Sequence, residues 1–388
     1  MNMRDRVLTT LDHREPDMVP LTEFAIDPPH MEALTGLKLE GQTSLQTPVS
    51  ADRKHEMANI DMTYRCYKRL GFELIPVELS APDGWQATKN PDGTMTDEWG
   101  RILRYTPVTR TWSPFRGIFH NPEDFDKFVL PDSDAPGRLF GIEQMKKLIK
   151  DDFAFGAFIR DPFAHVWEMF TPGNFVRWLY EKPQLIRKAI EELADFNVRI
   201  VRRLREVQVD LVISGGDYSE KNGPMVSPRF FREVIFPNLR RQAEEVHRLG
   251  LKFIKHSDGN LNPLLSDLAQ IVDGLHSLDP TAGMDIEAIK SQYGEKLVLF
   301  GNVSVDNLCR KSPDEIVQET KECLRLAAPG GGYILSSSNS WFADAKLENC
   351  LAMVETARKY GRYPISLPSD RYSTAMRHYS LMKHKRQC

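Results

Sequence analysis

Short apolar runs alternate with longer amphipathic segments along most of this chain. Each run ends in polar residues or glycine, which is typical of a buried strand followed by a loop. The runs cover residues 17–24, 73–79, 153–161, 209–217, 251–259, 273–280, 296–304 and 331–340. Segments with helical apolar spacing, such as residues 182–207 and 312–328, lie between them. Eight strands that alternate with helices predict an α/β fold, a (β/α)8 TIM barrel.

Two stretches interrupt this alternation. Residues 84–107 alternate in character around Asp92-Gly93, a dipeptide typical of a tight turn, and predict a β-hairpin inserted after the second strand. The segment from there to about residue 137 is rich in proline and aromatic residues and is interpreted as loop. No glycine-rich dinucleotide-binding fingerprint follows a strand, which disfavours a doubly wound fold. We therefore predict one barrel domain over residues 1–365 and a basic, frayed or partner-contacting tail over 366–388.

Composition narrows the classes of partner. A chain of 388 residues would usually hold more than one domain, but a barrel of this length is a single unit. The formal net charge is -3 and no long run of like charge precedes the C-terminus, so we expect neither a nucleic-acid nor a membrane partner. The five cysteines follow no paired spacing and the N-terminus lacks the apolar core of a signal peptide, so a cytoplasmic location is expected.

Polar side chains mark the ends of the predicted strands. The active site of a (β/α)8 barrel forms from the C-terminal ends of its strands and the loops that follow them. Those ends hold Glu23, Glu78, Arg160, Asp161, Asp217, His256, Asp258, Asp279, Asn302 and Asn339. Such a ring of side chains is suited to binding a metal ion or a polar substrate.

His256 and Asp258 are the most informative of these residues. They are two positions apart on an extended segment, so their side chains project to the same side while Ser257 points away. Imidazole nitrogen and carboxylate oxygen are good ligands for zinc or a similar divalent ion. The alternative is that Asp258 caps the next turn and His256 fills the mouth of the barrel.

The other candidates also have structural alternatives. Asp217 follows two glycines that allow a close backbone approach, but it is equally suited to capping a turn. His165 and Glu168 share a helix face if their segment is helical and are then placed to reach the mouth, or they form an ordinary surface pair. Asp279 precedes proline and either touches substrate or caps a turn, and Glu78 is similar.

Six segments at and near these strand ends carry a family resemblance. They are REPDMVPL (14–21), DEWGR (97–101), SPRFFREVIFPNLRR (227–241), HSDGNL (256–261), DPTAGMDIEAIKSQYGEKLVLFGNVS (279–304) and GGYILSSSNS (331–340). Together they resemble the uroporphyrinogen decarboxylase superfamily, in particular its bacterial branch related to cobamide-dependent methyltransferases. The resemblance covers about residues 1 to 362. It implies a (β/α)8 barrel with a deep cleft at the C-terminal strand ends, and a barrel that commonly pairs, compatible with a homodimer.

The resemblance offers two activities, and the chain departs from both patterns. Decarboxylases of the family carry an arginine-rich segment after the first strand, whereas residues 22–36 contain no arginine. A highly carboxylated tetrapyrrole needs fixed cations, so this loss disfavours decarboxylation. Zinc methyltransferases of the branch present H-x-C and a later cysteine. Here the first motif reads His256-Ser257-Asp258, and SSSNS with Asn339 stands at the later position.

We therefore predict a methyltransferase of a corrinoid-dependent methyl-transfer or O-demethylation system. His256, Asp258 and Glu168 are predicted to bind a divalent metal, most simply zinc. Asp217, Asp279, Asn339 and Glu78 are predicted to serve the chemistry or to contact the substrate. The chain has no D-x-H-x-x-G signature, so cobalamin is expected on a partner corrinoid protein, with a small molecule as methyl donor or acceptor. The alternatives are a decarboxylase-like enzyme on a carboxylated substrate and a non-catalytic barrel that binds a small ligand.

Overall fold

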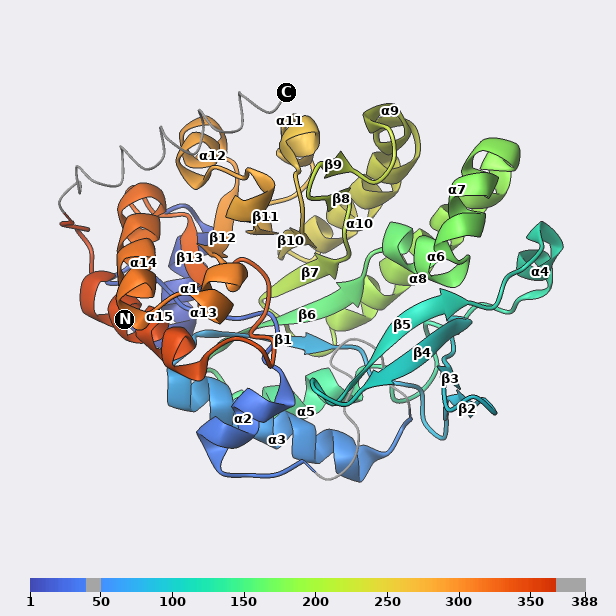
Figure 1. The fold of residues 1–388 in the computed structure, drawn as a ribbon, viewed down its shortest axis with the longest axis horizontal. Helices are drawn as coiled ribbons and strands as arrows, with labels where there is room; N and C mark the ends of the chain where they lie inside the picture. Colours follow the sequence, from blue (N-terminus) through green and yellow to red (C-terminus); the bar gives the residue numbers. More distant parts are fainter. Residues whose placement is uncertain (40–49, 368–388) are drawn as a thin grey trace.

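Seven of the predicted strands form one curled parallel sheet. The computed structural model describes residues 1–39 and 50–367. Across the sheet, the strands are β1 (Leu74–Glu78), β6 (Ala154–Arg160), β7 (Leu211–Gly215), β10 (Lys252–Ser257), β11 (Gly274–Ser277), β12 (Val298–Val303) and β13 (Tyr333–Ser337). Nearly all of their side chains are buried. Helices cover the outside of the sheet (Figure 1).

The N-terminal segment completes the ring between β13 and β1. Leu335 N donates to Pro20 O at 2.9 Å, and Glu73 N donates to Leu21 O at 2.9 Å on the other side. The segment forms an isolated parallel bridge at Leu21–Leu335 instead of a longer strand, and Pro20 has no N–H with which to extend the ladder. The (β/α)8 architecture predicted from the sequence is confirmed.

The helices pack mainly around the outside of the barrel (Figure 1). They are α1 (Met3–Leu11), α2 (Pro28–Thr35), α3 (Arg53–Leu70), α4 (Pro122–Lys127), α5 (Phe140–Ile149), α6 (Pro162–Met169), α7 (Pro172–Glu181), α8 (Pro183–Leu204), α9 (Pro228–Phe230), α10 (Phe236–Arg248), α11 (Leu265–Leu268), α12 (Ile286–Tyr293), α13 (Val305–Arg310), α14 (Pro313–Ala327) and α15 (Leu347–Tyr360). Among the described residues, no helix combines the length and apolar character that a bilayer crossing requires. Residues 368–388 of the predicted basic tail lie outside the described part of the chain.

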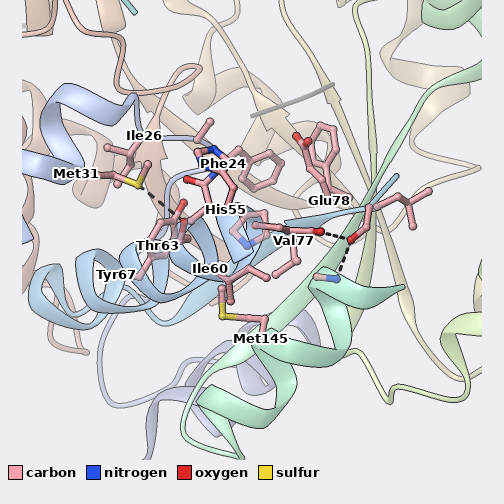
Figure 2. Close-up of a pocket in the computed structure, with 18 of the residues that line it drawn as sticks. Phe24, Ile26, Met31, His55, Ile60, Thr63, Tyr67, Val77, Glu78 and Met145 are labelled. Carbon is pink, nitrogen blue, oxygen red and sulfur yellow. Dashed lines mark hydrogen bonds between the residues drawn. The ribbon is translucent and has the colours of Figure 1, made fainter. Parts of the chain in front are cut away.

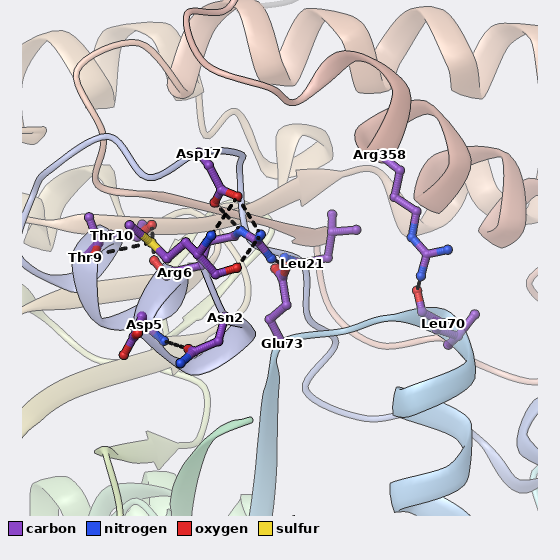
Figure 3. Close-up of polar contacts among 11 residues, drawn as sticks. Asn2, Asp5, Arg6, Thr9, Thr10, Asp17, Leu21, Leu70, Glu73 and Arg358 are labelled. Atoms are coloured by element: carbon purple, nitrogen blue, oxygen red, sulfur yellow. Dashed lines mark hydrogen bonds and ion pairs between the residues drawn. The ribbon is translucent and has the colours of Figure 1, made fainter. Parts of the chain in front are cut away.

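Helix α1 packs against the inside of the barrel. Val7 and Leu11 pack with inward-facing strand residues such as Leu74 and Ile213 in one buried cluster. Arg6 on the same helix pairs with Glu73, whose other oxygen accepts a hydrogen bond from Leu21 N at 2.8 Å (Figure 3). Glu73 thus ties α1 to the segment that closes the ring.

The insertion after β1 is larger than the predicted hairpin. It is a four-stranded antiparallel sheet of β2 (Thr88–Lys89), β3 (Met95–Thr96), β4 (Arg101–Thr106) and β5 (Thr111–Gly117). The turn at Asp92-Gly93 is present, with Gly93 at φ 82°. The prediction of loop beyond residue 107 was wrong because Pro114 hides the alternation of β5, in which Trp112 is buried.

Candidate functional site

The carboxyl ends of β7 and β10 bring Asp217, His256 and Asp258 together. These strands are neighbours, with His256 opposite Gly215, so Asp217 follows directly beside the His256–Asp258 segment. One ligand atom from each of the three side chains lies within 4.8 Å of the others. Within residues 1–39 and 50–367, this is the one such grouping of histidine, cysteine or acidic side chains suited to a metal ion.

Asp258 is the most constrained member of this group. Its N–H donates to Asp217 Oδ1 at 2.9 Å, and Asn339, just beyond β13, donates from Nδ2 to Asp258 Oδ2. The other oxygen, Oδ1, is buried and has no hydrogen-bond partner in the described part of the chain. Burial, reinforced by the charge of Asp217, raises the pKa of Asp258 well above its ordinary value. A cation bound at Oδ1 would offset both the cost of burying the carboxylate and its repulsion from Asp217.

His256 contacts a second histidine that the sequence analysis did not identify. His276 lies opposite His256 in the pairing of β10 with β11, and their Nδ1 atoms are 2.7 Å apart. Burial lowers the pKa of His256 to about 4 and that of His276 well below its usual range, so both rings are neutral and one Nδ1–H donates to the other. The ring of His276 stacks on Phe24, with 3.7 Å between centroids. This pair depends on the register between β10 and β11, which the apolar runs of the sequence do not give.

The backbone after His276 adopts an uncommon conformation. Ser277 and Leu278 have φ values of 97° and 53°, in the region that non-glycine residues rarely occupy. Ser277 Oγ donates to Ser338 O at 2.5 Å and Asn302 Nδ2 donates to Leu278 O at 2.9 Å. These contacts hold the strained segment at the strand ends, where strain commonly accompanies function.

Glu168 does not lie in the metal-site group. Its carboxylate accepts hydrogen bonds from Arg101 Nη1 at 2.7 Å and from Arg160 Nη2, so both oxygens are engaged by guanidinium groups. Arg101 comes from the inserted sheet and also holds Asp97 at 2.7 Å. Helix α6 does place His165 beside Glu168, but the His165 ring packs on Trp99 at 4.1 Å between centroids. The predicted role of Glu168 as a ligand is therefore corrected to that of a buried ion-pair partner.

Asp279, Glu23 and Asp161 have structural roles at the strand ends. Asp279 caps a short turn by accepting from Thr281 N at 2.8 Å and Thr281 Oγ1 at 2.9 Å, which is the capping alternative left open by the sequence. Glu23 is buried and accepts from Ser337 N at 2.6 Å and Ser337 Oγ at 2.8 Å. Asp161 caps α6 through Phe163 N at 2.9 Å.

Asp161 also anchors a buried lysine that the sequence analysis missed. Lys255 Nζ lies 3.0 Å from Asp161 Oδ2 and donates to Gly216 O at 2.7 Å. Tyr218 donates to the same aspartate oxygen at 2.7 Å, and Ser214 donates to it at 3.0 Å. Lys255 is the immediate neighbour of His256 on β10 but faces the other side of the strand, so this network braces the segment that carries the histidine.

A cavity of about 190 Å³ lies beside the group of Asp217, His256 and Asp258 (Figure 2). Phe24, Glu78 and Phe158 line it from the strands and their ends, and residues of α2, α3, α5 and β1 contribute to the rest. Phe24 links the two features, because its ring faces the cavity and stacks on His276. Burial raises the pKa of Glu78 well above its ordinary value, against the opposing charges of Arg160 and Arg101.

The comparisons with known proteins now identify the family. The sequence matches the family model described as "Uroporphyrinogen decarboxylase (URO-D)" over residues 111–360, more than half of the chain. The chain belongs to the uroporphyrinogen decarboxylase family. The resemblance stated from the sequence motifs is thereby confirmed. No curated protein sequence matches the chain.

Two solved structures show the same architecture as this member of the uroporphyrinogen decarboxylase family. A methyltransferase from Methanosarcina mazei is 19% identical, with a TM-score of 0.70 and coverage of 93% of this chain and 99% of that one. A B12-independent methionine synthase from Shewanella sp. W3-18-1, in complex with selenomethionine, is 12% identical, with a TM-score of 0.52 and coverage of 88% and 98%. At these identities, the likeness establishes the barrel fold.

Proposed function

We propose that this protein is a metal-assisted methyltransferase that works with a separate corrinoid protein. The observation that carries the proposal is the buried, unpartnered Oδ1 of Asp258 within 4.8 Å reach of Asp217 and His256. Buried polar atoms without partners are rare and commonly mark a site for an ion or water. The family membership and the fold shared with a methyltransferase support the same assignment.

The three side chains fit a divalent ion. They offer two carboxylates and one neutral imidazole, a donor set that suits zinc and also accepts harder ions such as Mn²⁺. A bound divalent ion would supply Lewis acidity that polarises an oxygen on the methyl donor or lowers the pKa of the acceptor.

The residues around these ligands orient them. Asn339 donates a hydrogen bond to Oδ2 of Asp258, and Oδ1 of the same carboxylate has no partner in the described part of the chain. When the Nδ1–H of His256 donates to Nδ1 of His276, the ring of His256 is fixed and its Nε2 keeps a lone pair that can bind a metal. Phe24 supports His276 from the cavity side.

The decarboxylase alternative is disfavoured by the charges near the site. Residues 22–36 contain no arginine, and no arginine or lysine is among the described residues that line the cavity. Arg101 and Arg160 lie near the strand ends, but both pair with Glu168. A substrate with several carboxylates would need unpaired cations there.

Metal content is the first test of this proposal. We expect near-stoichiometric divalent metal in protein purified without chelator, and its loss in His256→Ala and Asp258→Asn. Glu206→Gln changes an exposed carboxylate in the turn before β7 and serves as the matched control. A wild-type protein without metal, or unchanged metal content in both ligand variants, would reject the metal site.

Corrinoid dependence needs a second experiment. We expect formation or loss of methylcob(III)alamin, followed by its absorption spectrum, when the protein meets a corrinoid protein and a methyl donor. Turnover at the same rate without corrinoid would contradict this part of the proposal. Decarboxylation of a carboxylated substrate, or binding without turnover of any donor, would favour the alternatives of a carboxy-lyase or a non-catalytic barrel.

A further inference from the structure

The cavity beside the metal-site group has mostly apolar walls. Ile26, Ile60, Val77 and Met145 line it, together with the ring of Phe158 (Figure 2). Its volume of about 190 Å³ exceeds the roughly 150 Å³ of an engineered cavity that holds benzene. One substituted aromatic ring, or an aliphatic body of similar size, therefore fits.

The charged groups of the cavity are all acidic in the described lining. Asp52 is used as the cap of α3, where it accepts from Lys54 N and His55 N at 3.1 Å. Glu56 pairs with Arg53 at 2.6 Å and accepts from Ser80 Oγ.

Glu78 differs from these two carboxylates. The Glu78 carboxylate lines the cavity and has no hydrogen-bond partner within the described part of the chain, and Arg160 and Arg101 act on it only through their charges. Figure 2 shows Glu78 among the residues that line the cavity. One carboxylate of the cavity thus remains open to a ligand.

Two further polar atoms in the lining lack partners. Asn59 Oδ1 and His55 Nε2, on successive turns of α3, are buried and have no hydrogen-bond partner in the described structure. Asn59 Oδ1 accepts hydrogen bonds, the Glu78 carboxyl accepts them through an oxygen whether or not it carries a proton, and the His55 nitrogen either donates or accepts according to its tautomer. A ligand that supplies hydrogen-bond donors satisfies groups that the protein leaves unsatisfied.

We propose that this cavity binds the methyl donor or acceptor, and that this substrate is a small apolar molecule whose polar end donates hydrogen bonds and carries no negative charge. Alcohols, phenols and amines have this chemistry, whereas carboxylates lack a cation to meet them. The role of this molecule as a substrate rests on the proposed function, whereas the binding selectivity of the cavity does not depend on it.

The position of the cavity connects this ligand to the proposed chemistry. Phe24 forms part of the cavity wall, stacks on His276 and has its centroid 5.9 Å from that of His256. A molecule in the cavity would therefore contact a side chain that also packs on the histidine pair.

Three probes of equal size test the selectivity. Binding of 4-methoxybenzyl alcohol, 4-methoxybenzylamine and 4-methoxybenzoate to the full chain is measured by calorimetry, without metal or corrinoid. We expect one-to-one binding of the alcohol and the amine, and binding of the benzoate at least about tenfold weaker, because it buries an uncompensated charge beside Glu78. Benzoate binding as tight as that of the other two, or no binding of any probe, would overturn the inference.

Variants locate the binding in this cavity. Asn59→Leu is expected to weaken the alcohol and the amine, and Glu78→Gln to weaken the amine more than the alcohol, because only the amine brings a positive charge. Glu206→Gln makes the same chemical change on an exposed side chain and should alter none of the three affinities. Unchanged affinities in both cavity variants would place the binding elsewhere and refute the assignment.

This experiment separates the two proposals. If the probes bind as expected but methyl transfer never occurs, the cavity assignment stands and the proposed function fails. If methyl transfer occurs while the cavity variants and the probes show no selectivity, the proposed function stands and the cavity assignment fails.

Discussion

Asp258→Asn should have opposite effects on stability with and without a divalent ion. The ligand atoms of Asp217 and Asp258 lie within 4.8 Å of each other, and two negative charges at that separation repel by about 3 kcal/mol at an effective dielectric constant of about 20. Wild type without metal carries this repulsion or the cost of protonating Asp258. The variant removes either cost, while its amide oxygen can still accept from Asn339. We therefore expect the metal-free variant to match wild type or exceed it by up to about 3 kcal/mol.

Saturating metal should reverse this order. A ligand at about 100 times its dissociation constant stabilises the folded state by about 2.7 kcal/mol, and only wild type should gain that increment from Zn²⁺ or Mn²⁺. Urea denaturation, with chelator and with metal, measures both quantities. Asp285→Asn is the control, because Asp285 caps α12 through Glu287 N and Ala288 N, which predicts an equal loss in the two conditions. A metal-free Asp258→Asn protein that is clearly less stable than wild type would refute the reasoning.

Three further predictions concern stability. Lys255→Met leaves Asp161 as a buried, unpaired charge and should cost about 3–5 kcal/mol in urea denaturation, partly recovered by adding Asp161→Asn. Burial raises the pKa of Glu23 to about 8, so wild type should lose stability as pH rises from about 4.5 to about 8, by up to about 5 kcal/mol, and Glu23→Gln should abolish that loss in pH-dependent denaturation. In Gly117→Ala, the new Cβ would stand 1.3 Å from Met169 O. The loss of stability should therefore exceed the usual overpacking cost of about 1–3 kcal/mol and appear as a lower melting temperature.

The barrel could be predicted because its strands are buried on both faces. Such strands appear in sequence as short apolar runs, and the polar residue after each run marks the strand end. The strand ends also placed Asp217 beside the His256–Asp258 segment, because β7 and β10 are neighbours, although the sequence assigned Asp217 to the chemistry and Glu168 to the metal.

Contacts between distant parts of the chain could not be predicted in this way. Helical spacing placed Glu168 on the correct face of α6, but its partner Arg101 is 67 residues away, in a sheet whose second hairpin was taken for loop. His276 was hidden for a related reason. The pairing of His276 with His256 depends on the register between β10 and β11, which two continuous apolar runs do not reveal.

The two departures from the methyltransferase pattern are physically linked in this chain. The resemblance implies thiolates at the positions of Asp258 and of the SSSNS segment, and a thiolate pair would need no hydrogen bond between its members. Here the side chain of Asn339, from that segment, donates to Asp258 across the mouth of the barrel. A carboxylate at position 258 has a second oxygen that a thiolate lacks, and the amide of Asn339 satisfies it. The pair therefore leaves one oxygen, Oδ1, without a partner in the described part of the chain, and a carboxylate oxygen favours ions bound through oxygen and nitrogen over those selected by sulfur.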